Sequence, residues 1–107
     1  MKKPVQIIIY GSSLFLLAVA ASLYHFNSVE LILLPATTAA EKLIAYTPTV
    51  ILCLKKTVIP NWHLLLKAGF RLIEIDDQKS YVTLYCFQHH PQQYPINQTK
   101  DLLALIL

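Results

Sequence analysis

The first apolar stretch of the chain runs from Val5 to Phe26 and contains 22 residues without a formal charge. As a helix it would be about 33 Å long at roughly 1.5 Å per residue, enough to cross a hydrocarbon core of about 30 Å. Lys2 and Lys3 precede it, and the positive-inside tendency keeps such residues in the cytoplasm. The pattern predicts a single membrane-spanning helix that contacts lipid through residues 5–26.

An alternative for the same stretch is a cleaved signal peptide. A basic start, an apolar region and small residues at Ala18 and Ala20 are typical of such peptides, with cleavage after Ala20 or Ala21. The apolar run outlasts this cleavage position, which favours a retained anchor. Both interpretations assign residues 1–26 to the anchor or signal peptide and place residues 27–107 in an exported domain, which is periplasmic, luminal or extracellular.

Beyond this segment, short apolar runs alternate with helix signals, as expected for alternating strands and helices. The pattern predicts strands at 28–35, 49–56, 70–77 and 81–88, helices at 39–46, 62–68 and 99–107, and a polar loop at 89–98. The predicted fold class is therefore α/β, with an N-terminal transmembrane helix followed by a small β-α-β-α-β-β-α domain.

Three local signals refine these elements. Thr38 stands three residues before Glu41, the spacing of a helix capping box, and Gly69 suits the left-handed position that ends many helices. In the strand at 81–88, alternation predicts one face with Val82, Leu84 and Cys86 and another with Tyr81, Thr83, Tyr85 and Phe87. We expect the apolar end, 102–107, to pack on the sheet or against another protein, with the sheet as the favoured alternative.

Composition limits the size and the partners of the protein. A chain of 107 residues allows one domain, and its net charge of +3 includes Lys2 and Lys3. Without those two lysines, seven basic residues face six acidic ones, which leaves +1. This balance argues against a nucleic-acid partner, because phosphate contacts need a basic patch.

The chain contains two cysteines, Cys53 and Cys86, which are 33 residues apart. In an exported domain they could form a disulfide worth about 3 to 4 kcal/mol in the loop-entropy model, or remain as separate buried thiols. Asn97 begins an Asn-x-Thr glycosylation motif, although Thr99 is equally well explained as the N-cap of the last helix.

No residue pattern predicts catalysis, a cofactor or a metal. His89 and His90 are adjacent, so their side chains diverge in an extended segment, and His25 and His63 are distant in sequence. An acidic cluster, Glu74, Asp76 and Asp77, ends the third predicted strand, where α/β sheets often bind ligands but where such residues more often solvate a turn. The only glycines are Gly11 and Gly69, which excludes a glycine-rich phosphate loop.

Two segments resemble a known family. Residues 28–76, "SVELILLPATTAAEKLIAYTPTVILCLKKTVIPNWHLLLKAGFRLIEID", resemble the first β-α-β-α-β unit of glycogenin-like glycosyltransferases. Residues 94–107, "YPINQTKDLLALIL", resemble the segment before the Asp-x-Asp strand of that family, with Lys100 as a structural correspondence. The resemblance implies a truncated, inactive relative, because the sequence ends before the metal-binding Asp-x-Asp motif.

These observations predict a non-catalytic, single-pass membrane protein whose exported domain binds another protein, as an assembly subunit or an inhibitor does. The alternative is the truncated glycosyltransferase-like protein of the secretory pathway that the resemblance implies.

Overall fold

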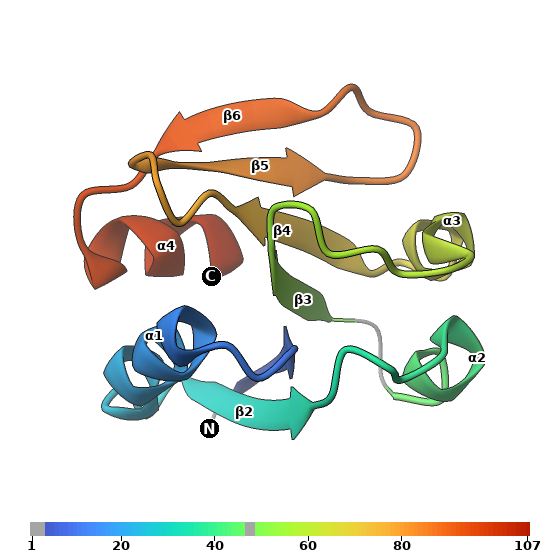
Figure 1. Ribbon diagram of the computed structural model, residues 1–107, viewed down its shortest axis with the longest axis horizontal. Coiled ribbons are helices and arrows are strands. Elements are labelled where there is room, and N and C mark those ends of the chain that lie inside the picture. The colour runs from blue at the N-terminus through green and yellow to red at the C-terminus, as the bar shows by residue number, and fades with distance from the viewer. Residues whose placement is uncertain (1–3, 47–48) are drawn as a thin grey trace.

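The computed structural model describes residues 4–46 and 49–107. Within these ranges the chain forms one sheet of six strands and four helices (Figure 1). The strands are β1 (Val5–Tyr10), β2 (Val29–Leu34), β3 (Val50–Leu54), β4 (Arg71–Ile75), β5 (Tyr81–Tyr85) and β6 (Gln92–Pro95). The helices are α1 (Leu14–Tyr24), α2 (Ala40–Leu43), α3 (Trp62–Lys67) and α4 (Thr99–Ile106).

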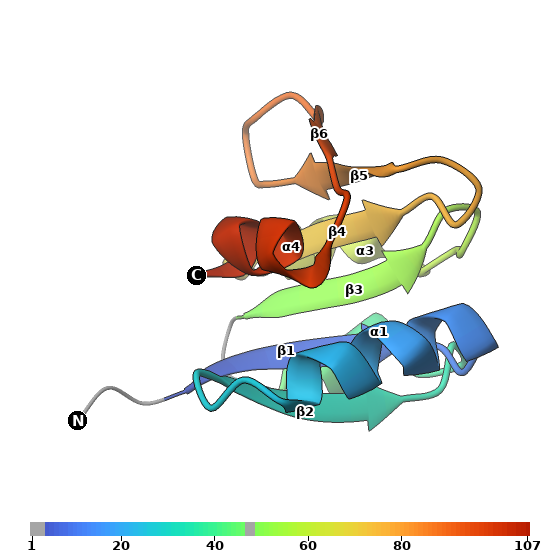
Figure 2. The same cartoon turned by 90° about the vertical axis from the view of Figure 1, so that its left-hand side faces the viewer.

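The sheet is mixed, with the strand order β2-β1-β3-β4-β5-β6. β1 pairs in parallel with β2 and β3, and β3 pairs in parallel with β4, whereas β5 and β6 are antiparallel additions. The order 2-1-3-4-5 is a common one in doubly wound α/β sheets. Helices α1 and α4 cover one face of the sheet, and α2 and α3 cover the other (Figures 1 and 2).

The uncharged stretch from Val5 to Phe26 is not a single helix. It contains β1, a turn at residues 11–13, and α1, which has only 11 residues. In the described ranges, 4–46 and 49–107, no helix combines the length and the apolar character that crossing a membrane requires. The predicted single-pass anchor and the membrane location inferred from it are therefore wrong.

The position of β1 also bears on the signal-peptide alternative. Cleavage after Ala20 or Ala21 would cut within α1 and remove β1. Because β1 lies between β2 and β3, its removal would divide the parallel part of the sheet.

Burial on both faces explains why β1 is apolar on both sides after Gln6. Ile7, Ile8 and Ile9 are all fully buried. Ile7 and Ile9 belong to the apolar cluster beneath α1 and α4, whereas Ile8 and Tyr10 belong to the cluster beneath α2 and α3. A parallel strand covered by helices on both faces is continuously apolar, a pattern that can be mistaken for part of a membrane helix.

A polar turn separates β1 from α1. Gly11 has a φ of 121°, a conformation that L side chains rarely adopt, and a Cβ there would lie 3.1 Å from Cδ1 of Leu16. Ser13 is the N-cap of α1, and its Oγ accepts a hydrogen bond from the Leu16 backbone N–H at 3.1 Å. These two residues end the strand and begin the helix.

The remaining elements lie largely where the hydrophobic pattern predicts them. β2 to β5 and α2 to α4 each fall inside a predicted range, whereas β6 lies within the predicted polar loop at 89–98. The predicted alternation in β5 is confirmed for Val82, Leu84 and Tyr85. Val82 and Leu84 belong to the cluster beneath α1 and α4, and Tyr85 packs against the opposite cluster.

The predicted helix signals have different outcomes. Gly69 adopts a left-handed φ of 102°, as predicted, and the backbone N–H groups of Gly69 and Phe70 bond to the carbonyls of Leu66 and Leu65 in a Schellman arrangement. The capping box of Thr38 and Glu41 is wrong, because α2 has Ala39 as N-cap without a side-chain hydrogen bond.

The loop before α2 is instead attached to β1 through a buried tyrosine. The hydroxyl of Tyr10 lies 2.7 Å from the carbonyl oxygen of Ala36 and 2.8 Å from that of Thr38. Its single proton can be donated to either carbonyl. This contact joins the end of β1 to the chain that follows β2.

The last helix packs on the sheet, as expected from its apolar residues. Leu102, Leu103 and Ile106 are buried, and the guanidinium of Arg71 donates hydrogen bonds to the carbonyls of Leu105 at 2.9 Å and Ile106 at 2.7 Å. A cation at a helix C-terminus is favourable because it satisfies free carbonyls and interacts with the helix dipole. Arg71 thereby links the start of β4 to the end of α4.

Two substitutions in the former anchor segment test this architecture. Ile8→Ala should lower the free energy of unfolding by about 2 to 5 kcal/mol, because it removes a fully buried side chain from an interior strand of the sheet. Leu14→Ala should change it by less than about 0.5 kcal/mol, because Leu14 is 86% exposed. Urea unfolding followed by circular dichroism measures both, and equal effects would contradict the placement of β1 and α1.

Candidate functional site

The face of the sheet that carries α2 and α3 is left partly open beyond α3. In the part of the chain that the structure describes, no helix covers this face of the β5–β6 hairpin (Figure 1). Two cavities lie here, with volumes of about 240 and 520 Å³. They share Glu74 and Tyr85, so they are adjoining parts of one surface.

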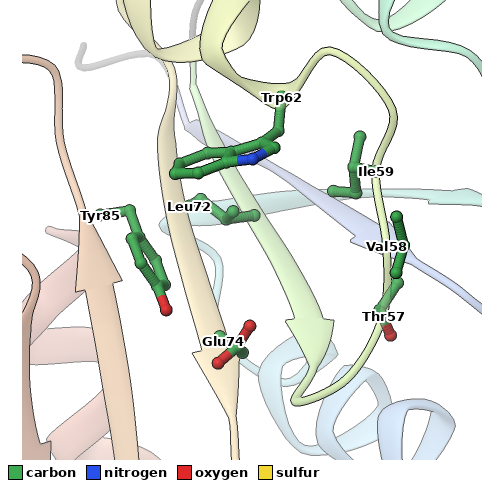
Figure 3. Close-up of a pocket in the computed structure, with 7 residues that line it drawn as sticks. All are labelled: Thr57, Val58, Ile59, Trp62, Leu72, Glu74 and Tyr85. Carbon is green, nitrogen blue, oxygen red and sulfur yellow. The ribbon is translucent and has the colours of Figure 1, made fainter.

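The smaller cavity is largely apolar and aromatic. Its lining residues are Thr57, Val58, Ile59, Trp62, Leu72, Glu74 and Tyr85 (Figure 3). The rings of Trp62 and Tyr85 meet edge to face, with centroids 5.6 Å apart. Figure 3 shows the indole of Trp62 toward one end of the cavity and the carboxylate of Glu74 toward the other.

Strand register and a tight loop place these side chains. Leu72 and Glu74 are two residues apart on β4 and therefore share a face, and Tyr85 on β5 is the register partner of Leu72. Trp62 is the first residue of α3, directly after Asn61, which has a left-handed φ of 60°. The chain between β3 and α3 supplies the opposite wall.

The larger cavity has a more polar lining. It is bordered by Lys55, Glu74, Tyr81, Thr83, Tyr85, Pro91 and Gln93. Alternation along β5 brings three of these residues to one face, and the pairing of Thr83 with Gln93 adds the side chain from β6. The surface thus changes from apolar near Trp62 to polar near the β5–β6 edge.

One ion pair stands beside this surface. The Lys55 ammonium lies 3.5 Å from Oδ2 of Asp76 and donates a hydrogen bond to the Tyr81 hydroxyl at 3.4 Å. The contact with Tyr81, followed by that with Asp76, raises the pKa of Lys55. Lys55 therefore pairs with Asp76, in the turn that follows β4. Among residues 4–46 and 49–107, Glu74 takes part in no ion pair.

Asp76 also organises the turn between β4 and β5. Its Oδ1 accepts hydrogen bonds from the backbone N–H groups of Gln78 at 2.9 Å and Lys79 at 3.2 Å. The hydrogen bond from Gln78, together with the charge of Lys55, lowers the pKa of Asp76 despite its burial. Of the predicted acidic cluster, Asp76 is thus a turn residue, Asp77 is exposed, and Glu74 alone of the three borders the aromatic cavity.

Burial is the main cause of the raised pKa of Tyr85, and the nearby charge of Glu74 adds to it. The Tyr85 hydroxyl remains protonated at neutral pH, and its interaction with the Glu74 carboxylate contributes to this shift of the pKa. The cavity combines this hydroxyl with a carboxylate and two aromatic rings.

The other residues singled out from the sequence do not gather at this site. Cys53 is buried and Cys86 partly buried, and both are free thiols in this structure. Asn97 is exposed, and its backbone N–H donates to Asp101. The N-cap of α4 is Gln98 rather than Thr99.

The histidines show no common site. His63 stacks beside Trp62 with ring centroids 4.0 Å apart, while His25 follows α1 and His89 and His90 lie in the exposed segment after β5. Across the described ranges, no three His, Cys, Asp or Glu side chains are grouped so as to hold a metal ion.

A second surface lies on the opposite face of the sheet, along α1. The exposed residues of this helix carry no charge and are mostly apolar: Leu14, Phe15, Leu17, Ala18, Ala21, Ser22 and Tyr24. Beside them, a groove of about 250 Å³ reaches from α1 to the start of α4, with Val19, Ile96 and Leu102 among its lining residues. The hydrophobic pattern had placed this helix in a membrane, so the surface was not recognised from the sequence.

Comparison with known proteins found no matching family model, no matching curated protein and no matching solved structure.

The two thiols should react differently. Burial, with a smaller contribution from Glu74, raises the pKa of Cys53 to about 12, so this thiol is protonated as well as inaccessible. We expect a disulfide-exchange reagent such as DTNB to label Cys86 alone in the native protein and both cysteines in urea. Absence of any labelling in urea would indicate instead that the two cysteines are bridged.

Asp76 should make stability depend on acidity. Because its folded-state pKa is lowered, its charge stabilises the folded protein above the ordinary carboxyl pKa of about 3.9, and this contribution is lost as the pH falls through the folded-state value. Asp76→Asn should therefore be less stable than wild type near neutral pH, and the difference should shrink in acid. Urea unfolding at several pH values measures it, with exposed Asp77→Asn as the control that should match wild type.

Proposed function

We propose that this protein is a non-catalytic interaction domain, an assembly subunit that associates with a second copy of itself through α1. The observation that carries the proposal is the uncharged, exposed apolar face of that helix. Single exposed apolar residues are normal on protein surfaces, but contiguous patches mark interaction sites. Here Leu14 is 86% exposed and Phe15 and Leu17 are each 39% exposed within a single turn of helix.

Side-chain size along α1 favours a second copy as the partner. The exposed residues of the first turn of α1 are bulky (Leu14, Phe15 and Leu17), the next ones are small (Ala18, Ala21 and Ser22), and the exposed Tyr24 ends the helix. In an antiparallel pair of α1 helices related by a two-fold axis, the bulky first turn of each helix would face the small residues of the other. Such an isologous contact is self-complementary, and cyclic dimers are the commonest oligomers.

The neighbouring groove supports the same partner. Ala18, Val19 and Ser22 of α1 line it together with Leu102 of α4. A bulky side chain such as Phe15 from the second copy would meet a hollow at this position rather than a flat surface. Because α1 is only about 16 Å long at roughly 1.5 Å per residue, we expect a reversible, micromolar association rather than an obligate dimer.

The absence of charge on α1 also favours self-association over a charged partner. From Leu14 to Tyr24 the helix has no acidic or basic residue, so its exposed face provides no electrostatic selectivity.

For the non-catalytic part of the proposal, the support is that, within residues 4–46 and 49–107, no histidine side chain hydrogen bonds to a serine, threonine or cysteine. A nucleophile and base pair normally shows such a contact.

The double substitution Leu14→Glu with Leu17→Glu tests the proposal. Wild type should dimerise reversibly in sedimentation equilibrium, and the variant should associate at least about tenfold more weakly, because two carboxylates would be desolvated at the contact. Folding should persist, since acidic residues near a helix N-terminus are favourable and Leu14 is exposed.

The matched control is Ile44→Glu, which introduces a carboxylate at a residue that is 44% exposed at the end of α2, on the opposite face of the sheet. It should dimerise like wild type. A wild-type protein that stays monomeric up to millimolar concentration would overturn the proposal, as would equal weakening by Ile44→Glu.

A further inference from the structure

We propose that the cavity formed by Trp62, Tyr85 and Glu74 is a binding site for an organic ammonium ion, with the charged nitrogen at Glu74 and the hydrocarbon part against the aromatic rings. This site lies on the α3 face of the sheet, so it is separate from the α1 surface and does not depend on the proposed self-association.

The shape of the cavity selects a small ligand with an apolar body. Its volume of about 240 Å³ is bordered by Leu72 from β4, by Val58 and Ile59 from the loop before α3, and by the two aromatic side chains. Figure 3 shows these groups surrounding a common space, with the indole of Trp62 over Leu72 and the loop residues facing them. Small-molecule sites are typically clefts of about 300 to 1,000 Å³ lined by apolar groups with a few polar ones, a range that this cavity reaches together with the adjoining one.

The charge of the ligand follows from the distribution of carboxylates and cations. Glu74 and Asp76 are both near this surface, but the ammonium of Lys55 is held 3.5 Å from Asp76 and by the Tyr81 hydroxyl. Glu74 is left without an ion pair among the described residues, and it is partly buried at the edge of the apolar cavity. A bound cation would form an ion pair with the Glu74 carboxylate, whereas this carboxylate would repel an anion.

The aromatic rings favour the same charge. Faces of tryptophan and tyrosine rings attract cations through their quadrupoles, and tryptophan does so most strongly. Trp62 and Tyr85 meet edge to face, so they form two sides of a corner rather than a closed stack. An ammonium or its adjoining methylene groups can contact both rings while the nitrogen donates hydrogen bonds to Glu74.

The lining of the adjoining cavity determines which substituents the ligand can have next to its ammonium group. It shares Glu74 and Tyr85 with the first cavity and continues past Thr83 and Gln93, which supply a hydroxyl and an amide, to the ammonium of Lys55, whose charge is paired with Asp76. A polar substituent extending from the ammonium end would lie there. The ligand class is therefore an amine with an apolar body, supplied either as a free molecule or as the side chain of a lysine.

Trp62 provides a direct measurement because it is the only tryptophan in the chain. Titration with benzylammonium chloride, followed by the indole N–H resonance and by tryptophan fluorescence, should show saturable binding. Benzyl alcohol and benzoate, which have the same ring without the positive charge, should bind at least about tenfold more weakly. A parallel titration with Nα-acetyl-lysinamide shows whether a lysine side chain binds more tightly than the free aromatic amine.

Glu74→Gln tests the role of the carboxylate, because it keeps size and hydrogen bonding but removes the charge. It should weaken binding of the ammonium probes by about tenfold and leave benzyl alcohol unchanged. The matched control, Asp77→Asn, removes an exposed carboxylate that does not line either cavity, and it should bind like wild type.

Three results would overturn the assignment: no saturable binding of either ammonium probe, equal binding of benzoate and benzylammonium, or unchanged ammonium binding in Glu74→Gln. Because Glu74 is only partly buried, the Glu74→Gln variant should fold. The NMR spectrum of its backbone amide groups tests folding independently of binding.

Discussion

The double-sided burial of β1 is the constraint on which the rest of the fold depends. This strand is hydrogen bonded to β2 on one side and β3 on the other, and its side chains enter both apolar clusters. A polar residue in place of Ile7, Ile8 or Ile9 would lose contacts in one of the two clusters. It would also leave a polar group without a hydrogen-bond partner in the core. The same constraint requires helices on both faces, and it requires a turn at Gly11 that returns the chain across the sheet as α1.

Most elements after residue 27 could be predicted because their signals are local. Alternation identifies the two faces of β5, and Gly69 with its left-handed backbone ends α3. The first strand and helix could not be recognised by the same reasoning. A buried parallel strand and a largely apolar helix together have the hydropathy of a membrane span, and only the polar turn at 11–13 separates them. That short turn was the available signal, and the length of the uncharged run outweighed it.

The candidate sites were harder to predict because they depend on tertiary packing. The sequence groups Glu74 with Asp76 and Asp77. In the structure, Asp76 accepts hydrogen bonds in the turn after β4, whereas Glu74 borders the aromatic cavity. Trp62 and Tyr85 are 23 positions apart, and nothing local indicates that their rings meet. The two surfaces lie on opposite faces of the sheet over different apolar clusters, so substitutions in one should act independently of those in the other.

The hydrogen bonds of Arg71 to the end of α4 hold the last helix on the sheet. They join residues 34 and 35 positions apart through a single planar guanidinium, which can direct two N–H groups at neighbouring carbonyls. A lysine at this position would supply only a point charge. The guanidinium of Arg71 thus fastens α4 to the middle of the sheet, and loss of these two hydrogen bonds would favour exposure of the side chains of β4 and β5 that α4 covers.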